Sequence, residues 1–256
     1  MKPFHVVIPA RYDSVRLPGK PLATIAGRPM IRWVWEKAVA SEAASVTVAV
    51  DHEAVAAACR SFGASVVMTR ADHASGTDRI SEVADRAGWP DDALVVNLQG
   101  DEPLMPPAVI RQVADLLVLH PEADMATLGT PIHSLEEYLA PQVVKLVADA
   151  GGAALYFSRA PVPWHRDGAP AGPASQSRYQ GAVRHLGIYG YRVGALSRLS
   201  GEPACRLEEI ERLEQLRALW SGMRIQTDTA VEVPPAGVDT PEDLERVNRI
   251  LAQAEA

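Results

Sequence analysis

Cysteine is scarce in this chain of 256 residues, and long apolar runs are missing from it. Cys59 and Cys205 are the only cysteines, too few and too far apart for a disulfide scaffold or a zinc site. No apolar run approaches the roughly 18 residues of a membrane span. The N-terminus enters a strand-like stretch without the basic and apolar regions of a signal peptide. We therefore expect a cytoplasmic protein that makes no contact with a membrane.

Positive charge is also in short supply. The 32 acidic residues outnumber the 25 basic ones and give a net charge of −7, which argues against a general nucleic-acid binder. A hydrophobic content of 47% is enough to bury a sizeable core and excludes disorder for most of the chain. The length and the absence of repeats or linker-like composition predict a single domain over residues 1–256.

The first half of the chain alternates short apolar runs with helical patterns. The runs that predict buried strands are 4–9, 46–50, 66–68 and 94–98. The stretches that predict helices are those beginning at Pro29, 53–62, the one from Ser75 or Thr77 to about Arg86, and 106–119. Strands that alternate with helices of this length predict an α/β fold with a parallel sheet and right-handed crossovers.

After residue 124 the predicted strands and helices no longer alternate regularly. Few helices separate the strand-like segments 125–131, 143–148, 153–157 and 183–191, so we expect mostly antiparallel pairing there, in a mixed sheet or a small subdomain spanning about 125–192. Residues 161–173 hold four prolines and predict a mobile loop that could serve as a lid. The chain then returns to helix over 206–220 and over 241–251, where Thr240 is the expected cap.

A cation-rich loop follows the first predicted strand. It carries Arg11, Arg16 and Lys20, with Gly19 free to make a tight turn. Ligands of open parallel sheets bind beyond the carboxyl ends of the strands, and guanidinium and ammonium groups there suit a triphosphate. A solvated basic loop is the alternative. The glycine spacings of a P-loop and of a dinucleotide-binding fingerprint are both absent, which counts against ATPases and dehydrogenases.

Two acidic residues stand at similar positions. Asp101 follows the predicted strand 94–98, and Asp239 precedes the last predicted helix. A carboxylate beside a phosphate site is the natural ligand of a Mg²⁺ ion shared with the substrate. Helix capping is the simpler role for either residue alone. The two acids together with the cationic loop predict a site for a metal and a triphosphate.

Several sequence blocks together are typical of one family. They are IPARY (8–12), RLPGKPL (16–22), MTRADH (68–73), SGT (75–77), VNLQGDEP (96–103), ALYFSR (154–159), RHLGIYGYR (184–192), LEQLR (213–217) and GVDTP (237–241). With these blocks the chain resembles the bacterial 3-deoxy-manno-octulosonate (Kdo) cytidylyltransferases over nearly its whole length. The first-loop pattern is shared by many sugar nucleotidyltransferases, whereas the blocks at 185–191 and 213–217 narrow the resemblance to the Kdo branch.

The resemblance implies a Rossmann-like nucleotidyltransferase fold, with a central mixed, mostly parallel sheet and a small antiparallel region for dimer contacts. It implies transfer of CMP from CTP to the anomeric hydroxyl of Kdo, with release of pyrophosphate, and a place in lipopolysaccharide synthesis. It also implies Mg²⁺ dependence and a homodimer, with strands 125–130 and 143–148 as the expected pairing surface. Ordinary core is the alternative for those strands.

The same resemblance assigns roles to single residues. We expect Lys20, Arg11 and Asp101 to be catalytic, and Asp101 and Asp239 to bind the metal. The residues expected to bind the nucleotide are Ala10, Arg11, Arg16, Lys20, Ser75, Arg79 and Asp101. The residues expected to bind Kdo are Gln99, His185, Tyr189, Glu214 and Gln215, of which Tyr189 could instead be core and Glu214 a solvated helix residue.

The sequence is also compatible with two other functions. A cytidylyltransferase for sialic acid or for a modified Kdo would need the same first loop and acids. A nucleotide-binding protein without catalytic activity could share the fold, although a decayed site need not retain both acids and the cations. CTP rather than UTP as the substrate rests on the resemblance alone.

Overall fold

The computed structural model describes residues 2–13, 17–73 and 75–254. Its strands are β1 (Phe4–Ala10), β2 (Thr24–Ile25), β3 (Arg28–Pro29), β4 (Ser45–Val50), β5 (Ser65–Met68), β6 (Leu94–Asn97), β7 (Met125–Pro131), β8 (Lys145–Ala148), β9 (Ala154–Ser158), β10 (Val183–Arg192) and β11 (Ile225–Thr229). Its α-helices are α1 (Met30–Ala40), α2 (Glu53–Ser61), α3 (Gly76–Ala87), α4 (Pro107–Leu119), α5 (Leu135–Leu139), α6 (Val193–Gly201), α7 (Arg206–Glu211), α8 (Gln215–Trp220) and α9 (Pro241–Ala254).

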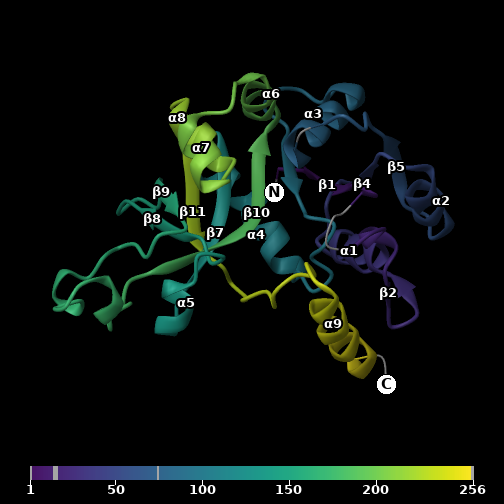
Figure 1. Ribbon diagram of the computed structural model, residues 1–256. Coiled ribbons are helices and arrows are strands. Elements are labelled where there is room, and N and C mark those ends of the chain that lie inside the picture. Colours follow the sequence, from purple (N-terminus) through teal and green to yellow (C-terminus); the bar gives the residue numbers. More distant parts are fainter. Residues whose placement is uncertain (1, 14–16, 74, 255–256) are drawn as a thin grey trace.

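One large mixed sheet runs through the described part of the chain, in the order β11-β7-β10-β6-β1-β4-β5 (Figure 1). The strands β6, β1, β4 and β5 pair in parallel, as the alternation of strands and helices predicts. Strand β10 runs antiparallel to both β6 and β7, and β8 and β9 pair antiparallel beside it. The predicted α/β class, with a mixed sheet that contains an antiparallel region, is confirmed.

The alternation of side chains along β1 builds two apolar layers. Val6 and Ile8 pack into a core with α1, α2 and α4, whereas Val7 packs into a second core with α3, α6 and α8. All three side chains are completely buried. Helices therefore cover both faces of the sheet, and the carboxyl ends of the parallel strands remain as the edge where polar loops gather.

The predicted helix over 206–220 is wrong in one respect, because the structure divides it into α7 and α8. Arg212 takes a left-handed backbone conformation with φ of 53°, and an α-helix cannot continue through such a residue. Leu213 and Leu216 pack into the second core, whereas Ile210 on α7 is 66% exposed. The break places Glu214 and Gln215 at the first turn of α8.

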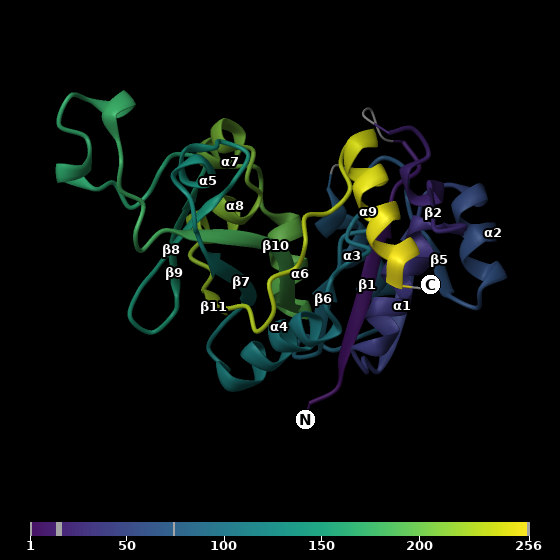
Figure 2. The same cartoon turned by 90° about the horizontal axis from the view of Figure 1, so that it is seen from below.

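One other expectation needs correction. Strand β7 cannot supply a dimer surface, because it lies between β10 and β11 and its residues 125–130 are all buried within one chain. The loop over 161–173 contributes no residue to the two cavities described below and extends outward from the sheet in Figure 2, so a role as a lid stays a prediction. The helices α5 and α6 and the strand β11 have no counterpart in the sequence-based predictions.

Candidate active site

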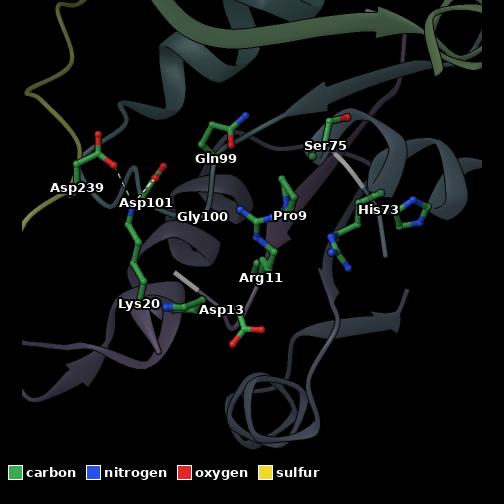
Figure 3. A pocket seen from close by; sticks show the side chains of 14 residues that line it. Pro9, Arg11, Asp13, Lys20, His73, Ser75, Gln99, Gly100, Asp101 and Asp239 are labelled. Atoms are coloured by element: carbon green, nitrogen blue, oxygen red, sulfur yellow. Dashed lines mark hydrogen bonds and ion pairs between the residues drawn. The ribbon is translucent and has the colours of Figure 1, made fainter. Parts of the chain in front are cut away.

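A cavity of about 410 Å³ opens at the carboxyl edge of the parallel strands. Figure 3 shows Lys20, Asp101 and Asp239 on one side of it and Ser75 and His73 on the other, with Arg11 between them. The residues that line it are Pro9, Ala10, Arg11, Asp13, Lys20, Pro21, His73, Ser75, Gly76, Arg79, Gln99, Gly100, Asp101 and Asp239. Every nucleotide and metal residue predicted from the sequence is among them except Arg16, which lies outside the described residues.

Lys20 contacts both acidic residues on one wall of this cavity. Gly19, with φ of 67°, turns the first loop into the short 3-10 helix that begins at Lys20. The Lys20 ammonium lies 2.5 Å from Asp101 Oδ2 and 3.1 Å from Asp239 Oδ1. Three segments that are far apart in the sequence thus direct one cation and two carboxylates to a single point beside the cavity.

The Asp239 carboxylate reaches this point because a long segment crosses from β11 to α9 (yellow in Figures 1 and 2). The Val238 N–H donates to the Asp101 carbonyl at 2.9 Å and fixes the segment against the loop that follows β6. Thr240 Oγ1 accepts a hydrogen bond from the Asp243 N–H, as an N-cap residue does. Thr240 therefore caps α9, as predicted, and the side chain of Asp239 is directed to Lys20.

Glu102 is an acidic neighbour that the sequence analysis missed. Burial, together with the charges of Asp101 and Asp239, raises the pKa of this carboxyl to about 8. A protonated Glu102 avoids a third negative charge beside Lys20. Its place next to Asp101 in the sequence was the signal available, but sequence alone does not reveal its burial.

Arg79 has a different environment from the one that its predicted nucleotide role suggests. Its side chain is 2% exposed, and its Nη2 lies 3.1 Å from Asp51 Oδ2. The other oxygen of Asp51 accepts a hydrogen bond from the Tyr12 N–H at 2.9 Å. The buried pair of Arg79 and Asp51 therefore anchors the first loop, and Asp51 is a second residue that the sequence analysis missed. It follows β4 at the same edge of the sheet.

The opposite wall is the N-terminal end of α3. Ser75 caps this helix, since its hydroxyl accepts from the Asp78 N–H and the Asp78 carboxylate accepts from the Ser75 N–H. Of the two caps that the sequence predicts, Ser75 or Thr77, the structure has Ser75. His73, also on this wall, hydrogen-bonds with Glu82 at 2.5 Å. The N-terminus of a helix favours negative charge, so α3 and Lys20 make both sides of the cavity suitable for phosphate groups.

Gly100 carries a specific steric demand. A Cβ atom at this position would lie 2.8 Å from the Pro9 carbonyl oxygen, closer than backbone atoms can tolerate. We expect Gly100→Ala to push the loop bearing Asp101 away from β1, lowering both the unfolding temperature and the turnover. Gly201→Ala, whose Cβ would meet nothing within 4 Å, is the matched control. Differential scanning fluorimetry and a turnover assay on both variants test this, and an unimpaired Gly100→Ala enzyme would contradict it.

A second, smaller cavity of about 100 Å³ adjoins the first, and Gly76 and Gln99 line both. It is lined by Gly76, Thr77, Asn97, Gln99, Met125, Tyr189, Tyr191, Leu199, Glu214 and Gln215. Four of the five residues that were predicted to bind Kdo thus meet around one hollow. The fifth, His185, lies behind Tyr189, with 5.3 Å between the two ring centroids.

The hydroxyl of Tyr189 is buried and has no hydrogen-bond partner within the described part of the chain. A buried polar group without a partner costs about 1–3 kcal/mol, so native proteins seldom retain one without a ligand or water to satisfy it. Since Tyr189 lines the smaller cavity, its hydroxyl is available to a polar ligand there.

His185 is neutral rather than cationic. Burial lowers the pKa of its imidazole to about 3, and its Nε2 lies 3.0 Å from Thr127 Oγ1. The imidazole behind Tyr189 is therefore a neutral polar ring, and not the positive charge that an acidic sugar suggests.

The depressed pKa of His185 predicts a pH dependence of stability. Between pH 6.5 and about 3 the unfolded chain binds a proton that the folded chain does not, so stability falls as the pH drops below 6.5. Each pH unit in this window costs up to about 1.4 kcal/mol. We expect His185→Gln to flatten this dependence in urea titrations at pH 5–7, while the exposed-site control His133→Gln leaves it unchanged. A His185→Gln curve parallel to that of the wild type would contradict the assignment.

The described residues offer no cluster of three or more histidine, cysteine or acidic side chains able to hold a metal ion. A metal at Asp101 and Asp239 would therefore need further ligands from a substrate. No helix in the described part of the chain is both long and apolar enough to span a membrane.

Comparisons with known proteins agree in one family. The sequence model of the cytidylyltransferases matches residues 5–225. The chain is 56% identical to a 3-deoxy-manno-octulosonate cytidylyltransferase of Alkalilimnicola ehrlichii, over 98% of this chain and 97% of that protein. It is 54% identical to a protein of the same name from Pseudomonas syringae pv. syringae, over 97% and 98%. The solved structure of CMP:2-keto-3-deoxy-manno-octonic acid synthetase complexed with CTP matches with a TM-score of 0.88 and 41% identity, over 99% of this chain and 100% of that one.

Proposed function

This chain belongs to the cytidylyltransferases, within the branch of the 3-deoxy-manno-octulosonate enzymes, and we propose that it transfers CMP from CTP to the anomeric hydroxyl of Kdo. The observation that carries the proposal is the pair of adjoining cavities. One has cationic and helix-terminal walls that suit a triphosphate, and the other has polar walls that suit a sugar acid. Because Gly76 and Gln99 line both, the two ligands would meet at these residues.

The reaction needs little covalent chemistry from the protein. The anomeric oxygen of the sugar attacks the α-phosphorus of CTP, the bond to the β-phosphate oxygen breaks, and pyrophosphate leaves as the hydroxyl proton is released. Such transfers depend on positioning the reactants and on stabilising negative charge. We assign the triphosphate to Arg11, Lys20 and the N-terminus of α3. Lys20 would stabilise the charge that develops on the departing pyrophosphate.

The smaller cavity is our proposed sugar site. Gln99, Tyr189, Glu214 and Gln215 supply hydrogen-bonding groups to its wall, and His185 supports Tyr189 from behind. The unpartnered Tyr189 hydroxyl supports a polar ligand at this place. A sugar with many hydroxyls can satisfy such groups, whereas an apolar ligand would leave them unpaired.

We further propose that Asp101 and Asp239 hold Mg²⁺. Their oxygens already converge on one cation, the Lys20 ammonium, beside the triphosphate cavity, and carboxylates are the ligands that Mg²⁺ prefers. When bound, the ion neutralises phosphate charge and lowers the barrier to attack at the α-phosphorus. The two aspartates would position it, and Lys20 would keep their charges balanced before the substrates arrive.

The wider setting is part of the same proposal. We place the reaction in the cytoplasm and in lipopolysaccharide synthesis, with a homodimer as the working form. We also propose that residues 1–256 form one nucleotidyltransferase domain. Strands β7 and β10 support this, because they share a sheet with β1. Sedimentation equilibrium would test the dimer, and a mass of one chain at micromolar concentration would contradict it.

The decisive assay is release of pyrophosphate from CTP in the presence of Mg²⁺ and a panel of acidic sugars, with UTP as the control nucleotide. We expect strong release only with CTP and Kdo. Release with CTP and a different sugar acid would retain the phosphate site and overturn the sugar assignment. No release with any pair would instead favour a nucleotide-binding protein without catalytic activity.

A further inference from the structure

The carboxylate of Glu214 is held at both oxygens on the wall of the smaller cavity. Its Oε2 accepts a hydrogen bond from the Thr77 hydroxyl at 2.6 Å, and its Oε1 accepts one from Arg217 Nη2 at 3.1 Å. Thr77 is 1% exposed and lies in the first turn of α3, 137 positions away in the sequence. A short bond from a fully buried hydroxyl to a carboxylate is stronger than a neutral hydrogen bond, so Thr77 restricts the orientation of Glu214.

Thr77 lies among other polar side chains of the smaller cavity. Asn97, Tyr191 and Gln99 line the same cavity, and Gln99 Nε2 donates to Asn97 Oδ1 at 3.3 Å.

Thr77 acts as a donor in this setting. It has one hydroxyl proton, and that proton goes to the Glu214 carboxylate. The orientation of Glu214 on the cavity wall therefore depends on the Thr77 hydroxyl on one side and on Arg217 on the other.

We propose that Thr77 is a positioning residue that sets the Glu214 carboxylate for the sugar on the wall of the smaller cavity. This inference rests on the proposed function of the smaller cavity as the Kdo site. In this proposal the N-terminal end of α3 contributes to both cavities. Its cap residue Ser75 lines the nucleotide cavity, and Thr77, two residues later, lines the sugar cavity.

The test compares Thr77→Val with Thr77→Ser. Valine keeps the size of the side chain but leaves Glu214 Oε2 without its donor. We expect the KM for Kdo to rise about tenfold, because a hydrogen bond to a charged group is lost. The KM for CTP should stay within about twofold of the wild type, since Thr77 does not line the nucleotide cavity. Serine retains the hydroxyl and should restore the KM for Kdo.

Two further variants separate positioning from stability. Thr77→Ala also removes the donor to Glu214 but adds no bulk, and we expect the same selective rise in the KM for Kdo. Thr227→Val is the matched control, because the Thr227 hydroxyl is also buried and bonded, to the Gly152 carbonyl at 2.8 Å, but lies outside both cavities. It should lower the unfolding temperature without a selective change in the KM for Kdo.

Several outcomes would overturn the inference. These are a Thr77→Val enzyme with an unchanged KM for Kdo, an equal rise in both KM values, or a Thr77→Ser enzyme as impaired as Thr77→Val. If Thr77→Val does not fold, the Thr77→Ala kinetics decide between positioning and a merely structural role. The wild type is assayed alongside, and its failure to use Kdo would refute the proposed function itself rather than the role of Thr77.

Discussion

Replacing Lys20 by alanine is expected to lower kcat by roughly 10²–10³-fold while the protein remains folded. The ammonium lies between two carboxylates at 2.5 and 3.1 Å, on the wall of the cavity that we assign to the triphosphate. Its removal would leave the departing pyrophosphate without its nearest cation. It would also leave the carboxylates of Asp101 and Asp239 to repel each other. Because Lys20 lies at the wall of a cavity and not in the apolar core, we expect its replacement to lower kcat more than the unfolding temperature.

Steady-state kinetics and thermal unfolding of Lys20→Ala check this prediction. Lys37→Ala on α1 is the matched control, since this lysine lines neither cavity. Its kcat should equal that of the wild type. A Lys20→Ala enzyme with near-normal turnover would remove Lys20 from the catalytic assignment.

Replacing Asp101 or Asp239 by asparagine should have an effect of comparable size. Asparagine keeps the shape of each side chain but removes a negative charge and weakens the binding of a hard cation. We expect kcat to fall by roughly 10²–10³-fold at fixed Mg²⁺, and the Mg²⁺ concentration for half-maximal activity to rise. Asp101 should be the more sensitive, because its side chain is 34% exposed against 54% for Asp239.

A Mg²⁺ titration of the activity of each variant provides the measurement, and Asp85→Asn, at an exposed position on α3, provides the control. If Asp239→Asn retained the Mg²⁺ dependence of the wild type, Asp239 would be left only as a partner of Lys20. If both variants retained it, the metal site would have to be sought elsewhere in the chain.

The sequence analysis was most successful where a local pattern decides the structure. The apolar run at β1 predicts a strand buried on both faces because Val6, Val7 and Ile8 follow one another without a polar residue between them. The Ser75 cap of α3 and the Thr240 cap of α9 are equally local, since each depends on residues within one helical turn. The helix break at Arg212 was missed because nothing in its neighbours marks a left-handed residue.

The residues of the candidate site were likewise predictable only where a local pattern decides their position. Polar residues that follow parallel strands must lie at one edge of the sheet, so Arg11 and Asp101 were predictable as neighbours. The roles of Glu102 and Asp51 were not, because burial and ion pairing depend on which distant segments cover a side chain. For the same reason the sequence did not reveal that Arg79, which lines the larger cavity as predicted, is also buried in an ion pair with Asp51 that anchors the first loop.

By itself the sequence determined the α/β class, the cationic first loop, the two acids and, through its motif blocks, the family. Only the tertiary structure decided that Lys20 meets Asp101 and Asp239, which lie 81 and 219 positions away. It also decided that strand β7 belongs to the core rather than to a surface. The physical reason is that strand and cap preferences act over a few residues. The meeting of charges, by contrast, depends on the order in which the strands pack and on the path of the segment that joins β11 to α9.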